Sequence, residues 1–242
     1  MLLLEAPILS KSPARIAGMF DAIAGRYDFL NHLLSLGIDR YWRWRAIGSL
    51  RLTGTEVVAD VCTGTADLAI AAAKAPHAAA RVIGIDFAAA MLAVGRHKVR
   101  RASLASRVQL VRGDATALPL PSASVNAVTV AFGVRNVERP DLACAEGYRV
   151  LRPGGRLAIL EFAIPTTPGV RAAYLAYFRY VLQHVGRWIS RHPAAYGYLP
   201  ASVDAFASPG ELVNMLRRSG FCDIRAVPLT FGVVFLYAAQ RE

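Results

Sequence analysis

The strongest signal for the fold is the sequence V-A-D-V-C-T-G-T-A-D-L, residues 58–68. A short apolar run enters a turn of small residues, and a helical pattern follows. Such a turn lets the backbone approach a nucleoside closely and aims helix N-terminal amides at it. A dinucleotide site needs G-x-G-x-x-G, whereas the only glycine here is Gly64, with Cys62 and Ala66 where that site has glycines. The turn therefore favours a cofactor without phosphates, such as S-adenosylmethionine, with Thr65 as a contact; an ordinary strand–helix turn is the alternative.

Short β-branched runs alternate with alanine-rich helical stretches on both sides of this turn. Strands are expected at residues 57–61, 81–86, 108–112, 125–132 and 157–162, and helices at 67–74, 88–101, 139–151 and 211–219. The last helix of the central zone should stop at the Pro-Gly-Gly of residues 153–155. Residues 221–227 and 233–239 read as a terminal hairpin. This alternation predicts a parallel sheet covered on both faces, which binds ligands beyond the carboxyl ends of its strands.

The predicted fold is α/β, a Rossmann-like, mostly parallel sheet of the class I S-adenosylmethionine-dependent methyltransferase type with a C-terminal antiparallel strand. A chain of 242 residues is expected to form one domain. Its predicted parts are an N-terminal helical cover (1–54), a cofactor-binding core (55–163), a helical substrate cap (164–208), and a terminal helix with strands (209–242).

Two further carboxylates follow predicted strands. Asp86 ends the second strand, where a carboxylate can accept hydrogen bonds from both ribose hydroxyls of a nucleoside. Asp114 ends the third, where it can face an adenine amino group while the Ala115 amide faces a ring nitrogen. Taken singly, the two acids also fit a helix cap and a turn. Together with the turn at Gly64, their order and spacing match a methyltransferase core.

After the fourth strand comes A-F-G-V-R-N-V, residues 131–137. The N/D-P-P-Y element that amino-group methyltransferases place here is absent, which argues against methylation of adenine or cytosine nitrogens. Cys144 falls inside a predicted helix, so it is badly placed as the nucleophile of a cytosine C5 enzyme. Arg135 and Asn136 are polar residues at the expected mouth of the pocket, and an ordinary loop arginine is the alternative reading.

The composition bounds the function classes. Hydrophobic residues are 55% and charged residues 19% of the chain, which excludes an intrinsically disordered protein. Three scattered cysteines suggest a reducing compartment and fit neither a disulfide framework nor a zinc site. No spanning segment or signal peptide is recognised. A net charge of +11 suits an anionic partner, nucleic acid or lipid. We expect a soluble or peripheral cytoplasmic protein, at most associated with the inner face of the cell membrane.

The chain resembles the ubiquinone/menaquinone biosynthesis C-methyltransferase family from about residue 19 to its C-terminus. The most specific matching motifs are M-F-D-A-I-A-G-R-Y-D-F-L-N (19–31) and A-F-G-V-R-N-V (131–137). The others are L-S-L-G-I-D-R-Y-W-R (34–43), D-V-C-T-G-T-A-D-L (60–68), G-I-D-F-A-A-A-M-L (84–92), R-V-L-R-P-G-G-R-L-A-I-L-E-F-A-I-P (149–165) and Y-G-Y-L-P-A-S-V-D-A-F (196–206).

The resemblance implies methylation of a ring carbon of a polyprenyl quinol with S-adenosylmethionine and without a metal. It implies a cofactor site that consists of Gly64, Thr65, Asp86, Asp114 and Ala115. We take Arg135 as the candidate catalytic residue, a cation that favours the quinol phenolate directly or through a water.

The chain departs from the family pattern at three places. Ala131 stands where some relatives have a cofactor-binding serine, and Asp114 where many have asparagine. Residues 231–242 differ from the family's usual C-terminus, which bears on substrate preference.

Two segments are expected to surround the substrate. Tyr27, Asp28 and Asn31 lie in the N-terminal cover. Residues 165–200 hold arginines and aromatics without an acid, a pattern that suits an anionic membrane surface. No nucleic-acid partner is expected, and a homodimer is compatible with the sequence. A nucleic-acid or other small-molecule methyltransferase and a non-enzymatic cofactor-binding module are the alternatives.

Overall fold

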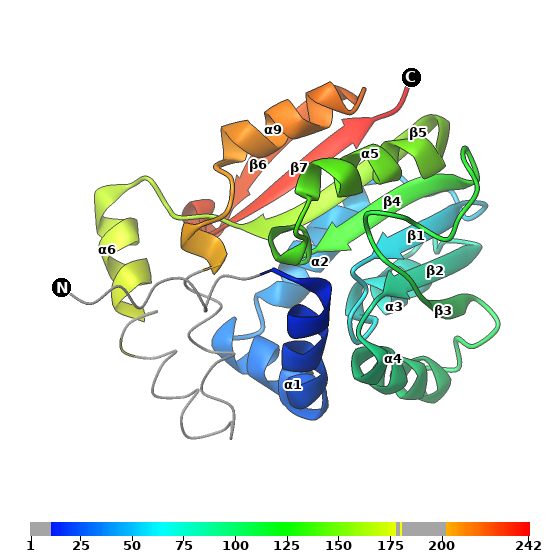
Figure 1. Ribbon diagram of the computed structural model, residues 1–242, viewed down its shortest axis with the longest axis horizontal. Helices are drawn as coiled ribbons and strands as arrows, with labels where there is room; N and C mark the ends of the chain where they lie inside the picture. The colour runs from blue at the N-terminus through cyan, green and yellow to red at the C-terminus, as the bar shows by residue number, and fades with distance from the viewer. Residues whose placement is uncertain (1–10, 178–179, 181–201) are drawn as a thin grey trace.

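A seven-stranded sheet in the order β3-β2-β1-β4-β5-β7-β6 forms the centre of the molecule in the computed structural model, which describes residues 11–177, 180 and 202–242 (Figure 1). The five strands from β3 to β5 are parallel, and β7 is antiparallel to both of its neighbours. The predicted fold class is therefore confirmed. The strands are β1 (Val57–Val61), β2 (Arg81–Asp86), β3 (Val108–Arg112), β4 (Val125–Ala131), β5 (Leu151–Phe162), β6 (Cys222–Leu229) and β7 (Val234–Gln240).

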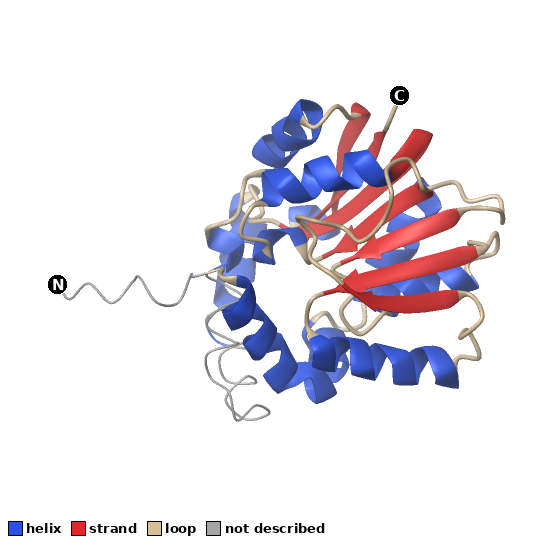
Figure 2. Cartoon of the chain, turned by 45° about the vertical axis from the view of Figure 1, so that its right-hand side comes forward, coloured by secondary structure: helices blue, strands red, loops and turns tan. Residues whose placement is uncertain are grey.

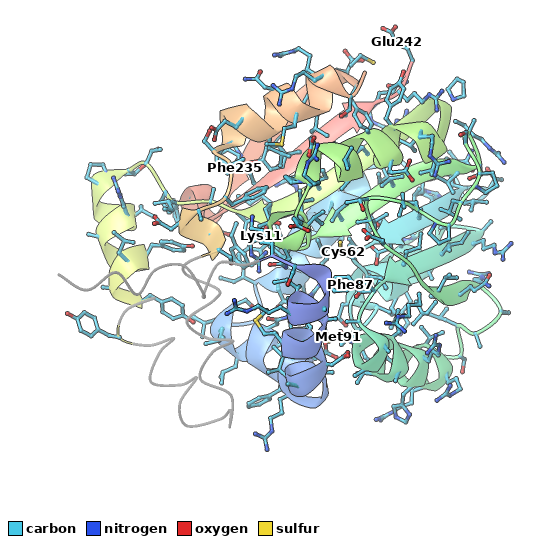
Figure 3. All side chains as sticks on the ribbon, viewed as in Figure 1. Lys11, Cys62, Phe87, Met91, Phe235 and Glu242 are labelled. Carbon is cyan, nitrogen blue, oxygen red and sulfur yellow. The ribbon has the colours of Figure 1, made fainter. Side chains whose placement is uncertain are left out.

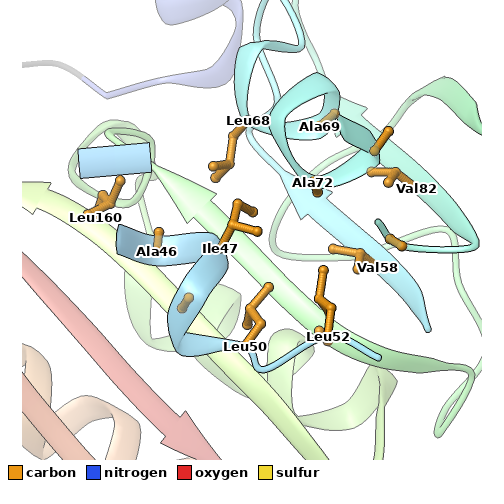
Figure 4. Packing of buried hydrophobic residues seen from close by; sticks show 14 of the residues in the cluster. Ala46, Ile47, Leu50, Leu52, Val58, Leu68, Ala69, Ala72, Val82 and Leu160 are labelled. Atoms are coloured by element: carbon orange, nitrogen blue, oxygen red, sulfur yellow. The ribbon is translucent and has the colours of Figure 1, made fainter. Parts of the chain in front are cut away.

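Helices cover both faces of the sheet (Figure 2). Apolar side chains of α2 and α3 form a core on one face, and those of α5 and α9 form a core on the other. Figure 4 shows the first of these cores, where Ile47 and Leu68 from the two helices meet Val58 from β1. The helices are α1 (Pro13–Leu34), α2 (Asp39–Ser49), α3 (Asp67–Lys74), α4 (Ala89–Arg101), α5 (Pro140–Val150), α6 (Pro168–Ala176) and α9 (Pro209–Arg218), with short 3-10 turns η1 (Val134–Asn136) and η3 (Thr230–Gly232).

One predicted boundary is wrong. We expected a helix to residue 151, a stop at the Pro-Gly-Gly sequence, and a strand from 157, whereas α5 ends at Val150 and β5 begins at Leu151. Gly154 has φ +76° and its amide donates to the Arg241 carbonyl at 2.8 Å. Where β4 pairs with β5, the register shifts next to Val125. The glycines therefore form an irregularity within the strand, because long-range pairing satisfies their backbone groups there.

The switch point of the sheet lies between β1 and β4, since β2 flanks β1 on its other side. Sheets of this kind place ligands at this crevice, beyond the carboxyl ends of the strands. Helix α1 lies beside α4 near that edge, and Asp21 Oδ1 accepts a hydrogen bond from the Ala90 amide at 2.8 Å. Among the described residues, no helix is long and apolar enough to cross a lipid bilayer.

Candidate functional site

In the turn after β1, every second residue has a left-handed backbone conformation. Cys62, Gly64 and Ala66 all have positive φ, at 55°, 54° and 67°. Such angles favour glycine, so the two non-glycine residues mark a turn whose shape the surrounding packing imposes. A Cβ on Gly64 would lie 3.4 Å from Met91 Cε. Figure 3 labels Cys62 and Met91 at the side of the sheet that faces α1.

Asp86 lies at the end of β2 and touches this turn. Its Oδ2 accepts the Gly64 amide at 2.8 Å and its Oδ1 accepts the Ala88 amide at 2.9 Å. Burial raises the pKa of this carboxyl, and the amide hydrogen bonds oppose that rise. Each carboxylate oxygen has a second lone pair, so the group can also accept from a pair of ribose hydroxyls.

Asp114 follows β3 and is exposed to solvent. Its Oδ1 accepts both the amide and the hydroxyl of Thr116 at 2.8 Å. The turn reading of this residue and the cofactor reading are compatible, because Oδ2 is the oxygen that can accept from an adenine amino group. Ala115, the neighbouring candidate, is buried against the apolar core beneath the strands.

A cavity that is partly open to solvent lies at the turn. One wall comes from the turn itself, with Gly64 and Thr65, and another from Phe132 after β4. The roof comes from α1 and α2, which contribute Tyr27, Asn31 and Arg43. Of the predicted cofactor residues, Gly64 and Thr65 line this cavity, whereas Asp86, Asp114 and Ala115 are not among its lining residues. Asp86 is joined to the cavity wall through its hydrogen bond from the Gly64 amide.

Ion pairs join the roof to the turn. The Thr65 hydroxyl donates to Asp28 Oδ1 at 2.5 Å, and Lys98 Nζ lies 2.5 Å from Asp28 Oδ2. Lys98 also pairs with Asp67, which lies 3.3 Å from Arg43 Nη2. The sequence predicts Thr65 as a cofactor contact, whereas in the structure its hydroxyl binds Asp28 of α1. The partners are 37 and 70 residues apart along the chain, so no local signal links them.

Asp60 is a cavity residue that sequence analysis missed. It is 1% exposed and accepts the hydroxyls of Thr63 at 2.6 Å and Thr129 at 2.7 Å. Gly84 makes room for Thr63, because a Cβ there would lie 2.8 Å from the Thr63 hydroxyl oxygen. The available signal was an acid inside a buried parallel strand, where charged residues are rare unless they have partners.

The Asp60 carboxyl should make the protein less stable near neutral pH than at pH 4. Burial raises its pKa to about 6, against about 3.9 in an unfolded chain. The native state thus holds the proton more tightly, and its stabilising effect disappears as pH rises from about 4 through 6. Asp60→Asn should increase the free energy of unfolding by about 2–3 kcal/mol more at pH 7.5 than at pH 4. Urea denaturation at both values checks this, and an equal effect at both contradicts it.

Arg135 lies in η1 as half of a buried ion pair. Its Nη1 donates to Glu161 Oε1 at 2.6 Å and to the Phe132 carbonyl at 2.6 Å. The Arg135 side chain is 7% exposed and that of Glu161 is 0% exposed. The sequence predicts Arg135 as a loop cation at the pocket mouth. It does not reveal the counter-ion, Glu161, which lies in the apolar run of β5. The Arg135 backbone amide also donates to Glu161, at 3.2 Å.

One donor of this pair is unsatisfied. Among the described residues, buried Arg135 Nε has no hydrogen-bond acceptor. Such a donor is costly unless a ligand or water accepts from it. The guanidinium lies 5.3 Å from the ring centre of Phe162, which stacks on Phe132 at 4.6 Å. Trp42 packs edge-on against both rings. Of these residues, Phe132 lines the cavity, whereas Arg135, Phe162 and Trp42 are not among its lining residues.

An aromatic residue of α6 also lies near the Arg135–Glu161 pair. Tyr174, from α6, is 7% exposed, and burial raises the pKa of its phenol. Burial lowers the pKa of Lys11, which is close enough to Glu161 and Arg135 to feel both charges. Asn136 is buried and donates to the Phe132 carbonyl at 3.3 Å. In the described parts of the chain, no group of three His, Cys, Asp or Glu side chains is arranged to hold a metal ion.

Solved structures with the same fold include enzymes of more than one reaction class. The [4+2]-cyclase SpnF superposes with a TM-score of 0.69 at 16% identity, covering 95% of this chain and 96% of that one. A S-adenosyl-L-methionine-dependent methyltransferase described as putative, from Methanococcus maripaludis, gives 0.66 at 19% identity and covers 92% and 94%. At this identity the likeness establishes the fold alone, which is that of S-adenosylmethionine-dependent methyltransferases.

Sequence relatives narrow the assignment. The chain is 44% identical to a ubiquinone/menaquinone biosynthesis C-methyltransferase from Syntrophotalea carbinolica over 224 residues, 93% of each chain. It is 44% identical to a demethylmenaquinone methyltransferase from Thermus thermophilus over 223 residues, 92% of this chain and all of the relative. Residues 9–241 match the profile of the ubiE/COQ5 methyltransferase family. The resemblance seen in the sequence is thereby confirmed, and the chain belongs to the ubiE/COQ5 methyltransferase family.

Proposed function

We propose that this enzyme transfers the methyl group of S-adenosylmethionine to a ring carbon of a polyprenyl quinol, in menaquinone or ubiquinone biosynthesis. The observation that carries the proposal is the buried Arg135 Nε donor, which lies without an acceptor near Phe162, whose ring stacks on the cavity-lining Phe132. A flat ring can stack on Phe132 and Phe162 while one of its oxygens accepts from this donor. The named activities of the two relatives support the same reaction.

The cofactor, when bound, supplies a methyl carbon that its sulfonium already activates. Gly64 and Thr65 would lie against its amino-acid part, Asp86 would accept from the ribose hydroxyls, and Asp114 with Ala115 would bind the adenine edge. These assignments rest on the turn geometry and on the carboxylate oxygens that keep lone pairs available. The buried surroundings of Asp86 strengthen its hydrogen bonds relative to water.

The chain's own residues then act on the quinol. A ring carbon becomes nucleophilic when a hydroxyl on the ring loses its proton, and for a phenol with pKa about 10 this costs about 4 kcal/mol at pH 7. The positively charged N–H of Arg135 stabilises the phenolate oxygen. The carbon–carbon bond forms as the sulfur–methyl bond breaks with its electron pair left on sulfur. The ring proton then leaves to solvent, and the ring regains its aromaticity.

Asp86 offers a direct test of the cofactor site. Asp86→Ala should weaken binding of S-adenosylhomocysteine about 10- to 150-fold in calorimetry, since hydrogen bonds to a charged group contribute about 1.5–3 kcal/mol. Asp86→Asn should retain part of the affinity. An analogue that lacks a ribose hydroxyl should bind the wild type more weakly but lose nothing further in Asp86→Ala. Equal losses from the missing hydroxyl in both proteins would show that Asp86 does not bind the ribose.

The substrate is tested by incubation with labelled S-adenosylmethionine and, separately, reduced demethylmenaquinone and the methoxy-polyprenyl benzoquinol. We expect label on a ring carbon of at least one product. Cofactor binding without transfer to either quinol would overturn the proposed substrate class.

The cap of residues 164–208 is proposed to cover the quinol and to contact the membrane at the inner face of the cell. Of its aromatics, buried Tyr174 lies on the Arg135 side, which supports a cap over this part of the site. Most of the arginines and aromatics behind this proposal lie outside the described residues: Phe178, Arg179, Arg187, Trp188, Arg191, Tyr196 and Tyr198. The domain boundaries and a homodimer stay predictions.

A further inference from the structure

Large apolar side chains are exposed on the bend formed by the end of α1, the following turn and α2. Within the described parts of the chain, six of the ten exposed large hydrophobic residues fall in this stretch. We call these six the elbow surface: Phe29, Leu33, Leu36, Ile38, Tyr41 and Trp44. Leu36 is 81% exposed and Trp44 is 65% exposed. Such a concentration of exposed apolar area marks an interaction site, whereas scattered single residues do not.

The backbone places these side chains on one side of the bend. Phe29 and Leu33 are one helical turn apart on α1, so they lie on the same face. Leu36 has φ +51° and precedes Gly37 at φ +77°, so a left-handed tip carries the leucine outward. The cavity-lining residues Tyr27 and Asn31 are offset from Phe29 and Leu33 by two positions, which places them on the opposite side of the helix. Helix α1 therefore separates the cavity from the elbow surface.

The charge around this surface has one sign. Residues 26–51 contain two acids, Asp28 and Asp39, and both are paired, with Lys98 and Arg43. Arg26 and Arg40 are exposed. Arg45 Nη1 donates to the Tyr41 hydroxyl at 2.8 Å. Apolar tips bordered by arginine, tyrosine and tryptophan match the interface of an anionic bilayer.

The elbow also adjoins the cap. The Tyr177 hydroxyl, at the end of α6, donates to the Leu34 carbonyl at 2.7 Å. Figure 1 shows α6 on the same side of the molecule as the bend between α1 and α2. We propose that the elbow surface docks on the anionic lipid bilayer, so that the cavity roof lies at the membrane. The inference rests on the proposed function, because a polyprenyl tail resides in the bilayer.

A second copy of the chain fits the surface less well. A two-fold symmetric dimer through the elbow would bring the exposed Arg40 side chains of both copies into one interface. The elbow offers no unpaired acid to oppose them, since Asp28 and Asp39 are engaged within the chain. Anionic headgroups supply the missing charge.

The test is co-sedimentation with vesicles of phosphatidylcholine alone and of phosphatidylcholine mixed with phosphatidylglycerol. Wild-type protein should bind the mixed vesicles more tightly, and added salt should weaken that binding. The double variant Leu36→Asp with Trp44→Ser should bind at least about tenfold more weakly, since burial of two CH₂ groups already corresponds to about that factor.

Leu33 and Leu142 form a matched pair, because both are helical leucines with 42% exposure and Leu142 lies on α5. Leu33→Asp should weaken vesicle binding, and Leu142→Asp should not. Unchanged binding by the elbow variants, or no binding by the wild type, overturns the proposal. So does a wild-type dimer that the elbow variants dissociate without loss of vesicle binding.

Folding and the proposed function are checked separately. S-adenosylhomocysteine calorimetry on every variant should give the wild-type affinity, which shows that the fold is intact. Turnover of a short-tailed quinol in detergent needs no vesicle. Failure of that turnover would count against the proposed function, whereas failure of vesicle binding with turnover intact would count against the elbow alone.

Discussion

Replacement of Arg135 by glutamine should lower kcat at pH 7 about 10³-fold. The reason is the cost of about 4 kcal/mol to form a phenolate at that pH, most of which we assign to the Arg135 Nε–H. A tenfold change in rate corresponds to about 1.4 kcal/mol, so a stabilisation of that size accounts for the expected loss. Affinity for S-adenosylhomocysteine should stay within about threefold, because none of the assigned cofactor contacts involves Arg135.

The single variant leaves Glu161 as a buried charge without its partner, which by itself can cost about 3–5 kcal/mol of stability. The matched protein is therefore the double variant Arg135→Gln with Glu161→Gln, which restores the charge balance. It should fold more stably than the single variant and remain equally slow. Recovery of activity in the double variant would show that the loss came from the unpaired acid.

The pH profile separates chemistry from packing. The slow variants should gain about tenfold in rate per pH unit from 7 toward 10, because hydroxide then forms the phenolate unaided. Wild-type and variant rates should converge over this range. A constant ratio of the two rates across it would mean that Arg135 holds the site together without acting on the phenol.

Gly133→Ala should lower the free energy of unfolding and weaken cofactor binding. Both effects should be larger than those of any other single methyl group added in the core. A Cβ at this position would overlap the Cβ of Cys62 and lie 3.0 Å from its Sγ. Gly133 has φ −107°, which alanine adopts freely, so the penalty is steric. Overpacking of this kind typically costs about 1–3 kcal/mol. Since Cys62 begins the cofactor turn, we expect at least about tenfold weaker binding as well.

A second change should rescue it. Cys62→Gly removes the overlapping atoms at a position whose φ of 55° suits glycine. The double variant should therefore recover most of the urea midpoint and of the S-adenosylhomocysteine affinity that Gly133→Ala loses. Gly147→Ala is the control, because the nearest atom there lies 3.9 Å from the new Cβ. Additive losses in the double variant would contradict the proposed contact.

Much of the fold could be predicted because its signals are local. Each strand–helix unit has its own change of hydrophobic period, and parallel strands bring the residues that follow them to one edge. This is why the sequence alone predicts that the turn at Gly64 and the Asp86 carboxylate lie at the same edge of the sheet. The stop expected at Gly154 failed for the converse reason, since strand pairing from elsewhere outweighed a local turn signal.

The sheet, the turn after β1 and the family could all be predicted from the sequence, since they depend on residue types at short spacing. The partners of the charged groups depend instead on the folded chain. Glu161 lies 26 residues beyond Arg135, and Asp28 reaches Thr65 across 37 residues. Likewise, only packing shows which apolar residues of α1 and α2 stay exposed. Burial and the exclusion of water set these pairings, and both are properties of the assembled chain that no single segment carries.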